Sequence, residues 1–310
     1  MLKRLRRHLS ADPAEQLLCY VDKNGCGVEI GPSHRPVAPK RAGYKVHIID
    51  HLDREALIEK YKGQNVAVEN IEEVDFVWKG EPYAELTGRS KFYDWVIASH
   101  LIEHTPDLIG FINECESILN ENGVLSLAVP NLAYCFDHFR PTTGIARVID
   151  SHLSRNKIHT PGTAAEYTLY RAYRDGQVAW REKYGAKGEF TLAHSLDDAR
   201  NAMDRAMHGG DYQDFHAWCF TPHSFRLLIH DLFCLGFISL KEVSFFPTEG
   251  YEFYMTLGRM GKGPNLSRLE MLKAAKLEAS IYPKLSNFLW RHIKRLTTRR
   301  PRYRRHSDSK

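Results

Sequence analysis

Three side chains in the stretch ASHLIEHTPDL (98–108) are of types that could do chemistry: His100, Glu103 and His104. The same His-x-x-Glu-His order marks one class of zinc proteases, in which two imidazoles on one helix face bind the metal and the glutamate acts as general base. Imidazole also titrates near neutral pH, so either histidine could instead take a proton from a substrate hydroxyl group. The choice depends on the elements that position these side chains.

The zinc interpretation requires an uninterrupted helix through the string, and the flanking sequence predicts a different structure. Residues 92–99 form a short apolar run rich in β-formers, which predicts a buried strand. Downstream, Thr105 as a cap and Pro106 in the first turn predict a new helix over 108–122, with Gly123 as its stop. The string is therefore expected at the carboxyl end of a strand, which disfavours a helical pair of zinc ligands.

Short apolar strands and helical segments alternate along the chain. A helix with Thr221 at its N-cap and Pro222 in its first position then precedes a predicted hairpin. This pattern predicts an α/β fold with a seven-stranded, Rossmann-like sheet and an antiparallel edge. The predicted strands cover 27–31, 45–50, 74–78, 94–99, 124–129, 238–246 and 251–260, and the predicted helices cover 53–63, 81–88, 108–122 and 221–237.

Open α/β sheets bind ligands where their strands end, so EIGPSHRP after the first strand is the expected ligand turn. A pyrophosphate needs several glycines and a helix N-terminus behind them, but only Gly31 is present, and three nearby prolines disfavour a long helix. Asp50 ends the second strand, 21 residues after Glu29, in a place from which a carboxylate reaches a ribose. The turn therefore favours a nucleoside without phosphates, particularly one that carries a positive centre.

These segments resemble the class I S-adenosylmethionine-dependent methyltransferases, of the type 11 branch found as methyltransferase-domain proteins in bacteria. The resemblance covers residues 25–140 closely and resumes at 214–225. It is carried by VEIGPSHRPVAPK, by HIID, and by YDWVIASHLIEHTPDLIGFINECESILNENGVLSLAVPN. The resemblance implies a seven-stranded methyltransferase sheet and S-adenosylmethionine as the cofactor.

By the same resemblance, the cofactor contacts are assigned residue by residue. Asp50 is expected to hold both ribose hydroxyls through charge-assisted hydrogen bonds. Trp78 or backbone groups are expected to contact the adenine, because Trp78-Lys79-Gly80 stand where many relatives have an acidic residue. The other expected contacts are Glu29 and Gly31 at the amino-acid end, Pro32 and Ser33 in the turn, His51 beside the adenine, and Ser99 with His100 at the methionine portion and the methyl group.

Three uses of the His-x-x-Glu-His string stay open within this family. His104 or His100 could act as the general base for a hydroxyl acceptor, which is the favoured use. Glu103 could brace the loop through hydrogen bonds to the backbone. Some O-methyltransferases with a Glu-x-x-Glu-His version bind a divalent ion, but His100 replaces the first glutamate here, so no metal is assigned.

Residues 136–213 interrupt the sheet pattern and carry no convincing strand signal, so they are expected to form a helical lid or substrate subdomain. Helices are predicted at 163–185 and 195–210. The residues that could reach the acceptor are His194, Asp211, Asp214, His216 and Trp218. The expected organisation is a basic segment at 1–20, a methyltransferase domain at 21–135 and 214–260, the insertion at 136–213, and a basic amphipathic helix with a tail at 261–310.

Charge is distributed unevenly along the chain. Residues 1–10 carry +4 and residues 284–310 carry +9, whereas the whole chain carries +5, so residues 11–283 carry −8. An acidic body disfavours a nucleic-acid-binding face. Apolar residues from 285 to 296 fall on one helical face, which would suit peripheral association with an anionic membrane or docking on the domain or a partner.

The sequence also bears on location and activity. Six cysteines without a C-x-x-C pair, no apolar run of about 20 residues and no signal peptide predict a cytoplasmic protein, peripheral to the membrane at most. The expected activity is methyl transfer to a hydroxyl group of a carbohydrate or another small polar acceptor, with carbohydrate favoured by analogy alone. The alternatives are an inactive binding module at a membrane and an RNA methyltransferase.

Overall fold

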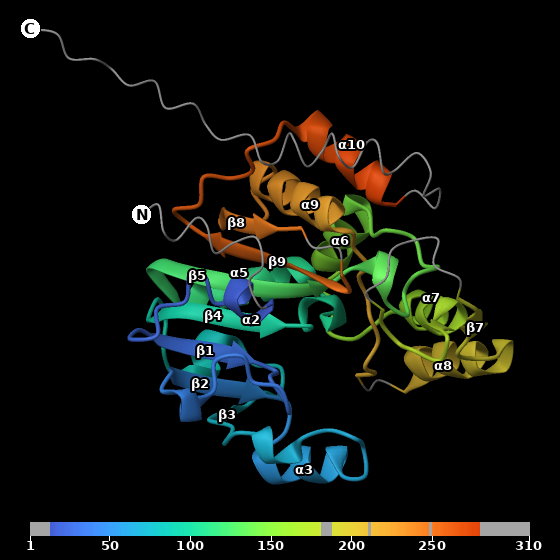
Figure 1. Ribbon diagram of the computed structural model, residues 1–310, viewed down its shortest axis with the longest axis horizontal. Helices are drawn as coiled ribbons and strands as arrows, with labels where there is room; N and C mark the ends of the chain where they lie inside the picture. The colour runs from blue at the N-terminus through green and yellow to red at the C-terminus, as the bar shows by residue number, and fades with distance from the viewer. Residues whose placement is uncertain (1–12, 181–187, 210–211, 248–249, 280–310) are drawn as a thin grey trace, which may run out of the picture.

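The centre of the protein is a seven-stranded sheet. The computed structural model describes residues 13–180, 188–209, 212–247 and 250–279. The sheet consists of β1 (Cys26–Ile30), β2 (Lys45–Asp50), β3 (Phe76–Val77), β4 (Tyr93–Ser99), β5 (Leu119–Pro130), β8 (Lys241–Phe246) and β9 (Glu252–Gly258). The strand order is β3-β2-β1-β4-β5-β9-β8 (Figure 1). The first five strands run parallel, and β9 is antiparallel to both β5 and β8, which confirms the predicted fold class and its antiparallel edge.

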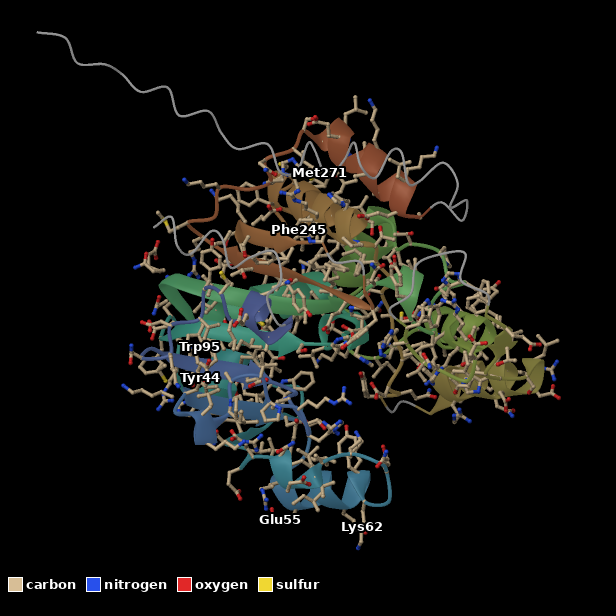
Figure 2. The ribbon with its side chains drawn as sticks, viewed as in Figure 1. Tyr44, Glu55, Lys62, Trp95, Phe245 and Met271 are labelled. Carbon is tan, nitrogen blue, oxygen red and sulfur yellow. The ribbon has the colours of Figure 1, made fainter. Side chains whose placement is uncertain are left out.

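The central strands are apolar on both faces because helices and loops cover both sides of the sheet. In β4, Trp95, Val96 and Ile97 are fully buried. Gly27 of β1 pairs with Trp95, and a Cβ atom added there would lie 2.0 Å from the indole ring. Only glycine therefore leaves room for this ring. Figure 2 shows Trp95 near Tyr44, and the two rings pack edge to face with their centroids 6.2 Å apart.

Helices flank the sheet and hold its strand ends in place. They are α2 (Pro13–Leu17), α3 (Arg54–Tyr61), α4 (Tyr83–Thr87), α5 (Leu108–Ile118), α9 (Pro222–Cys234) and α10 (Arg268–Glu278). Asp53 caps α3 as predicted, because its carboxylate accepts a hydrogen bond from Ala56 N at 2.8 Å. α5 and α9 bury their apolar faces in one core, whereas Leu17 of α2 belongs to a second core. α10 lies on α9, where Met271 is buried (Figures 1 and 2).

Short 3-10 helices connect several of these elements. They are η2 (Lys40–Ala42), η3 (Val68–Asn70), η4 (Ile102–His104) and η5 (Leu132–Tyr134). The loop between β1 and β2 contains η2 alone, as its prolines predicted. η4 follows the end of β4 and carries two of the three residues of the opening string, so the string is not part of an α-helix.

α5 starts and ends differently from the predicted helix over 108–122. Asp107 caps it instead of Thr105, because its carboxylate accepts a hydrogen bond from Gly110 N at 2.9 Å. The helix ends at Ile118 rather than at Gly123, because the next residue already pairs with β4 in the sheet. Tertiary pairing therefore ends this helix before its glycine does.

Between β5 and α9 the chain builds a separate lobe beside the sheet (Figure 1). α6 (Ile145–Leu153) packs beside α5 on the core of the sheet, and the lobe contains α7 (Pro161–Tyr170), β6 (Ala172–Arg174), β7 (Phe190–Leu192) and α8 (Leu196–His208). The helix predicted at 195–210 is present, but the one predicted at 163–185 ends at Tyr170, and the expected absence of strands is wrong. Asp175 and Gly176 explain why the helix does not continue, since both have positive φ and form a tight turn that pairs Arg174 with Gln177.

No helix in the described ranges combines the length and the apolar character that a membrane crossing requires. The basic segment at 1–20 and the C-terminal helix and tail at 261–310 fall largely outside the described residues. Of these two predicted regions, the structure describes α2 and α10.

Candidate active site

Four neighbouring parallel strands end at one edge of the sheet, and each end carries a residue that the sequence singled out. Gly31 follows β1, Asp50 ends β2, Trp78 follows β3 and Ser99 ends β4. Because β3, β2, β1 and β4 are adjacent in this order, the structure brings the four positions into one row. Such a row is the usual ligand edge of an open parallel sheet.

The turn after β1 is held open by two left-handed residues. Gly31 has φ +63° and Ser33 has φ +50°. A Cβ atom at Gly31 would lie 3.1 Å from the side chain of Leu101, so glycine serves both the backbone conformation and the close approach. Ser33 N donates a hydrogen bond to Asp50 Oδ2 at 3.3 Å, and Pro32 lies between the two left-handed residues. The turn is therefore tied to the end of β2.

Asp50 is 4% exposed and already accepts three hydrogen bonds. Its Oδ2 accepts the bond from Ser33, and its Oδ1 accepts bonds from His51 N at 2.8 Å and from His51 Nδ1 at 2.6 Å. A carboxylate offers about four lone-pair sites, so one remains. The expected pair of ribose bonds therefore requires the His51 side chain, which is 49% exposed, to rotate away. Lys60 Nζ lies 3.0 Å from the other nitrogen of this ring.

Glu29 is held by hydrogen bonds within the chain. It is 1% exposed, and its two carboxylate oxygens accept hydrogen bonds from Val37 N at 2.7 Å and from Ala38 N at 3.0 Å. Burial raises the pKa of Glu29 to about 7, although the two backbone bonds favour the ionised form. The side chain braces the loop that follows the ligand turn, and its contact with the amino-acid end of the cofactor stays a prediction.

Trp78 lies at the end of the row, with 40% of its surface exposed. Its backbone N donates to Asp50 O at 2.8 Å, and its indole Nε1 donates to Glu81 O at 2.8 Å. Its ring is tilted against Tyr83 with the centroids 6.1 Å apart. The indole is thus oriented by both its polar and its apolar contacts, beside the β2 end that carries Asp50.

His100 follows β4 directly and has φ +50°, a conformation that a non-glycine residue adopts at a cost of about 1–3 kcal/mol. Its Nε2 is hydrogen-bonded to Glu252 Oε2 at 2.7 Å, and Tyr254 Oη donates to the other oxygen of that carboxylate. Burial lowers the pKa of His100, but the bond to Glu252 and the charge of Glu103 outweigh it, so the pKa is raised. The bond to Glu252 fixes the orientation of the His100 ring. It uses Nε2, so Nδ1 is the ring nitrogen that Glu252 does not contact.

Glu103 braces its surroundings through its backbone and not through its carboxylate. Its carbonyl oxygen accepts hydrogen bonds from Ala217 N at 2.7 Å and from Trp218 N at 3.3 Å. Its carboxylate is 1% exposed and has no hydrogen-bond partner among the described residues. The predicted side-chain brace is therefore not formed. The nearest imidazole nitrogens are His100 Nδ1 at 3.7 Å and His104 Nε2 at 3.9 Å.

His104 contacts the chain segment that follows α8. Its Nδ1 lies 2.8 Å from Asp214 Oδ1, and its carbonyl oxygen accepts a bond from Tyr212 Oη at 3.2 Å. Burial lowers the pKa of His104, but Asp214 and Glu103 raise it further, so the net shift is upward. The ring of His216 packs edge-on against it, with the centroids 4.5 Å apart. Asp214 and His216 thus lie against the string, and their contact with the acceptor stays a prediction.

His216 belongs to a buried chain of polar contacts. Its Nδ1 donates to Asp137 Oδ2 at 2.5 Å, and Arg140 Nη1 donates to Asp137 Oδ1 at 2.8 Å. Arg140 Nη2 in turn donates to Glu166 Oε1 at 2.9 Å. Burial favours the neutral acid, but His216 and Arg140 hold the pKa of Asp137 far below its ordinary value. An ionised Asp137 therefore fixes the ring of His216.

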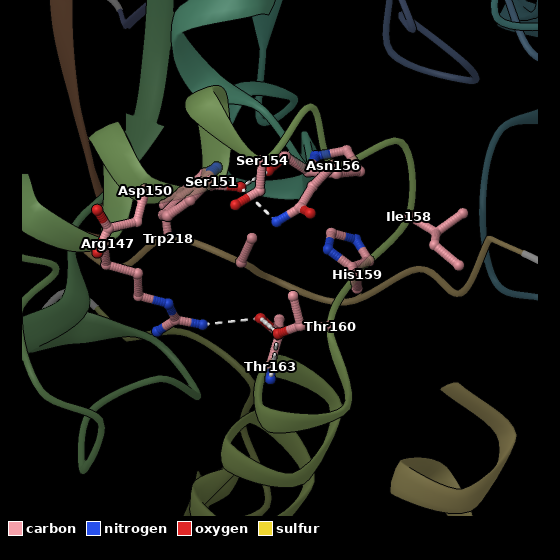
Figure 3. A pocket seen from close by; sticks show the side chains of 12 residues that line it. Arg147, Asp150, Ser151, Ser154, Asn156, Ile158, His159, Thr160, Thr163 and Trp218 are labelled. Carbon is pink, nitrogen blue, oxygen red and sulfur yellow. Dashed lines mark hydrogen bonds between the residues drawn. The ribbon is translucent and has the colours of Figure 1, made fainter. Parts of the chain in front are cut away.

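A cavity of about 420 Å³ lies beside η4, between α6 and α7 (Figure 3). Trp218 forms one wall, and its Nε1 donates to Thr105 O at 2.7 Å. Arg147 reaches across to Thr163, whose Oγ1 accepts a bond from Nη2 at 2.8 Å. The polar residues of the lining are Arg147, Asp150, Ser151, Ser154, Asn156, His159, Thr160 and Thr163, and the apolar ones are Pro106, Ile158, Ala217 and Trp218.

Comparison with known proteins identifies the family. Residues 1–231 match the sequence profile of the family described as "Methyltransferase domain". The chain belongs to this family. The match and the seven-stranded sheet make the protein a class I S-adenosylmethionine-dependent methyltransferase, as its sequence motifs predicted. S-Adenosylmethionine is therefore its methyl donor, and the row of strand ends is the edge at which this fold binds ligands.

Solved structures resemble the methyltransferase at low sequence identity. A SAM-dependent methyltransferase from Aquifex aeolicus is 10% identical, with 83% of this chain and 95% of that chain covered and a TM-score of 0.37. The CcbJ methyltransferase from Streptomyces caelestis is 10% identical, with 80% of this chain and 96% of that chain covered and a TM-score of 0.41. None of the curated proteins matches the methyltransferase.

Two residues of this methyltransferase site were missed in the sequence. Glu252 begins β9, and because β9 is antiparallel to β5, its start lies at the edge where the parallel strands end. The predicted hairpin next to the fifth strand was a signal that could have located it. Asp137 lies in a loop after η5 and has no pattern around it that predicts its contact with His216.

Proposed function

We propose that this methyltransferase acts on a hydroxyl group of a small polar acceptor, with carbohydrate as the favoured class. The observation that carries the proposal is the cavity beside η4. Its lining combines a carboxylate, an amide, a guanidinium and several hydroxyl groups with the indole of Trp218. Sugars present hydroxyl groups along their edges and apolar C–H faces, so they match polar groups that surround one aromatic wall. The cavity adjoins the string, because Pro106 lines it two residues after His104.

The row of strand ends supports the proposed cofactor contacts. A buried, ionisable carboxylate at the end of β2 and a backbone turn opened by Gly31 fit a nucleoside that carries positive charge, and they offer no pyrophosphate cradle. Asp50 would hold the ribose and Trp78 the adenine, with Ser33, His51 and Ser99 lining the remainder. Glu29 supports this surface from below by fixing the loop 37–38.

We assign the proton acceptor to His100 rather than to His104. His100 stands at the end of β4, and Glu252 orients its ring so that Nδ1 is the nitrogen with a lone pair. In both rings one nitrogen lies against a carboxylate and the other faces Glu103, so position decides: only His100 directly follows β4 at the row of strand ends. S-Adenosylmethionine supplies an electrophilic methyl group when bound. His100 would take the proton of the acceptor hydroxyl as its oxygen bonds to the methyl carbon, while the S–CH3 bond breaks and S-adenosylhomocysteine leaves.

A methyl-transfer assay with isotopically labelled donor tests this assignment. The acceptor panel should hold monosaccharides and oligosaccharides beside small phenols and short RNAs. The His100→Ala variant is expected to lower kcat by roughly 10²–10⁴ with cofactor affinity within about threefold of the wild type. The Asp150→Asn variant is expected to raise the acceptor KM about tenfold, because a charged hydrogen bond to the acceptor is lost.

The Asp197→Asn variant is the matched control, because this aspartate lies on the exposed face of α8, away from the cavity. It should behave as the wild type. Methylation of RNA or phenols with no transfer to any sugar would overturn the acceptor class. An unchanged kcat in a folded His100→Ala variant would remove this residue from the chemical step.

A further inference from the structure

Glu103, His104 and His216 form a compact group whose candidate ligand atoms all lie within 4.8 Å of one another. Glu103 and His104 belong to η4, whereas His216 comes from the segment after α8, 112 residues further along the chain. Glu103 and His216 are buried and His104 is partly buried. Two imidazoles and one carboxylate on one side of an ion are a frequent ligand set for divalent transition metals.

The Glu103 carboxylate points to a missing cation. It is 1% exposed, and neither of its oxygens has a hydrogen-bond partner among the described residues. The closest imidazole nitrogens, at 3.7 Å on His100 and 3.9 Å on His104, are beyond hydrogen-bond length. An ionised carboxylate held in this way costs several kcal/mol unless a positive charge reaches it. No donor in the described chain does so at bonding distance.

His216 is oriented as metal ligands usually are, and a carboxylate also lies beside His104, whose Nδ1 has no hydrogen bond among the described residues. His216 Nδ1 donates to Asp137 Oδ2 at 2.5 Å, and His104 Nδ1 lies 2.8 Å from Asp214 Oδ1. A metal-binding histidine almost always donates its outer N–H to a carboxylate or a carbonyl group, which fixes the tautomer and the ring. These contacts leave Nε2 of each ring for the inner side of the group. Arg140 holds Asp137 from behind, so the support of His216 is itself fixed.

We propose that Glu103, His104 and His216 bind one divalent first-row transition-metal ion, such as Zn²⁺ or Mn²⁺, through one carboxylate oxygen and two imidazole Nε2 atoms. The bond lengths of such sites, about 2.0–2.2 Å, place ligand atoms roughly 3–3.5 Å apart, so the group needs only a small contraction. Two imidazole ligands favour a transition metal over Mg²⁺ or Ca²⁺. Three protein ligands leave coordination positions open for water or another oxygen ligand.

This set differs from the one that the sequence offered. The string contains His100, Glu103 and His104, but Glu252 occupies Nε2 of His100. His216 takes the third place instead. With three ligands, the ion could bind an acceptor oxygen and lower the pKa of its hydroxyl group, a role that rests on the proposed function. The binding site itself does not rest on it.

Metal binding is tested on the full-length protein, stripped with chelator and without acceptor or donor. Equilibrium dialysis against ZnCl₂ or MnCl₂, with metal analysis of the protein, should give one ion per chain and a higher Tm on loading. Co²⁺ in place of these ions should give visible absorption bands of a site with nitrogen and oxygen ligands. Absence of stoichiometric binding of all three ions would overturn the proposal, and a protonated His104 would then be the partner of Glu103.

Variants locate the ion. Glu103→Gln keeps the side-chain volume and loses no hydrogen bond of the carboxylate, so it should fold and bind the ion at least 100-fold more weakly. His216→Ala should do the same, and Asp214→Asn should weaken binding roughly 10-fold through its loss of charge beside His104. His208→Ala, on the exposed end of α8, is the matched control and should bind as the wild type does. Equal affinity in Glu103→Gln and wild type would overturn the assignment. Cofactor affinity is measured separately, and it shows whether each variant keeps the methyltransferase fold.

Discussion

Asp50 illustrates how one carboxylate ties the cofactor edge together. It joins the turn after β1 to the end of β2, and three of its hydrogen bonds come from Ser33 and His51. Its position was predictable, because a strand that ends in an acidic residue has a clear sequence signal. Its bond to His51 was not, because neighbouring residues on a strand end show no periodic pattern that fixes a side-chain rotamer.

We expect Asp50→Ala to weaken S-adenosylmethionine binding by about 2–4 kcal/mol, because charged hydrogen bonds to the ribose are lost. Calorimetric titration measures this affinity. Asp53→Asn is the control: it removes the same charge three residues further along, and asparagine keeps the N-cap of α3. A folded Asp50→Ala variant with wild-type affinity would show that the ribose lies elsewhere.

Glu29 makes stability depend on pH in a direction opposite to that of most carboxylates. Its pKa in the folded protein is about 7, above the ordinary 4.5, so the folded state holds the proton more tightly than the unfolded chain. The stabilisation from this group is fully present below pH 4.5 and is lost as the pH rises towards 7. Between pH 5 and 8 it removes on the order of 2–3 kcal/mol from the free energy of unfolding.

The prediction is tested by urea unfolding of wild type and Glu29→Gln at pH 5, 6.5 and 8. Glutamine stays neutral, so the free energy of unfolding of the variant should fall less with rising pH, whatever its constant offset. Glu55→Gln, at an exposed position of α3 labelled in Figure 2, should follow the wild-type slope. Parallel curves for wild type and Glu29→Gln would contradict the assignment of the slope to this carboxyl group.

At the scale of elements, strands and caps with strong local signals were predictable. The runs that became β2 and β4 are apolar and β-branched, and the Thr-Pro start of α9 follows a common helix N-terminus. Elements that depend on distant partners were not. The end of α5 is set by pairing with Tyr93 of β4, and β6 exists because residues 190–192 return to it. Asp175-Gly176 is a local turn signal inside the predicted helix, but an apparent helical period covered it.

The candidate site also contains positions that were predictable from the sequence and positions that depend on distant contacts. Strand-end positions were predictable from topology, because parallel strands must end at a common edge. The group of Glu103, His104 and His216 was not, because His216 arrives from 112 residues away, across the whole lobe between β5 and α9. Spacing within one short string therefore pointed to His100 as the third member, whereas tertiary contact places Glu252 beside it.

For the molecule as a whole, charge separates the methyltransferase body from the basic C-terminal residues. We expect deletion of 284–310 to leave cofactor affinity unchanged and to abolish binding to anionic vesicles, because the segment carries nine net positive charges. Flotation with phosphatidylserine-containing vesicles measures the association, and vesicles of neutral lipid are the control. Vesicle binding by the truncated protein would assign the tail to a different partner.

The antiparallel strand β9 also has a consequence for how the chain is made. Glu252, the residue that orients His100, follows Pro130 at the end of β5 by 122 positions, so a ribosome that adds about 5–20 residues per second needs roughly 6–24 s to deliver it. During that time the nascent chain has β1 to β5 in order but no neighbour for the outer edge of β5. An apolar strand with an unpaired edge readily pairs with another chain. Translational pausing after β5 should therefore lower the yield of native enzyme through aggregation, even when every residue of the site is unchanged.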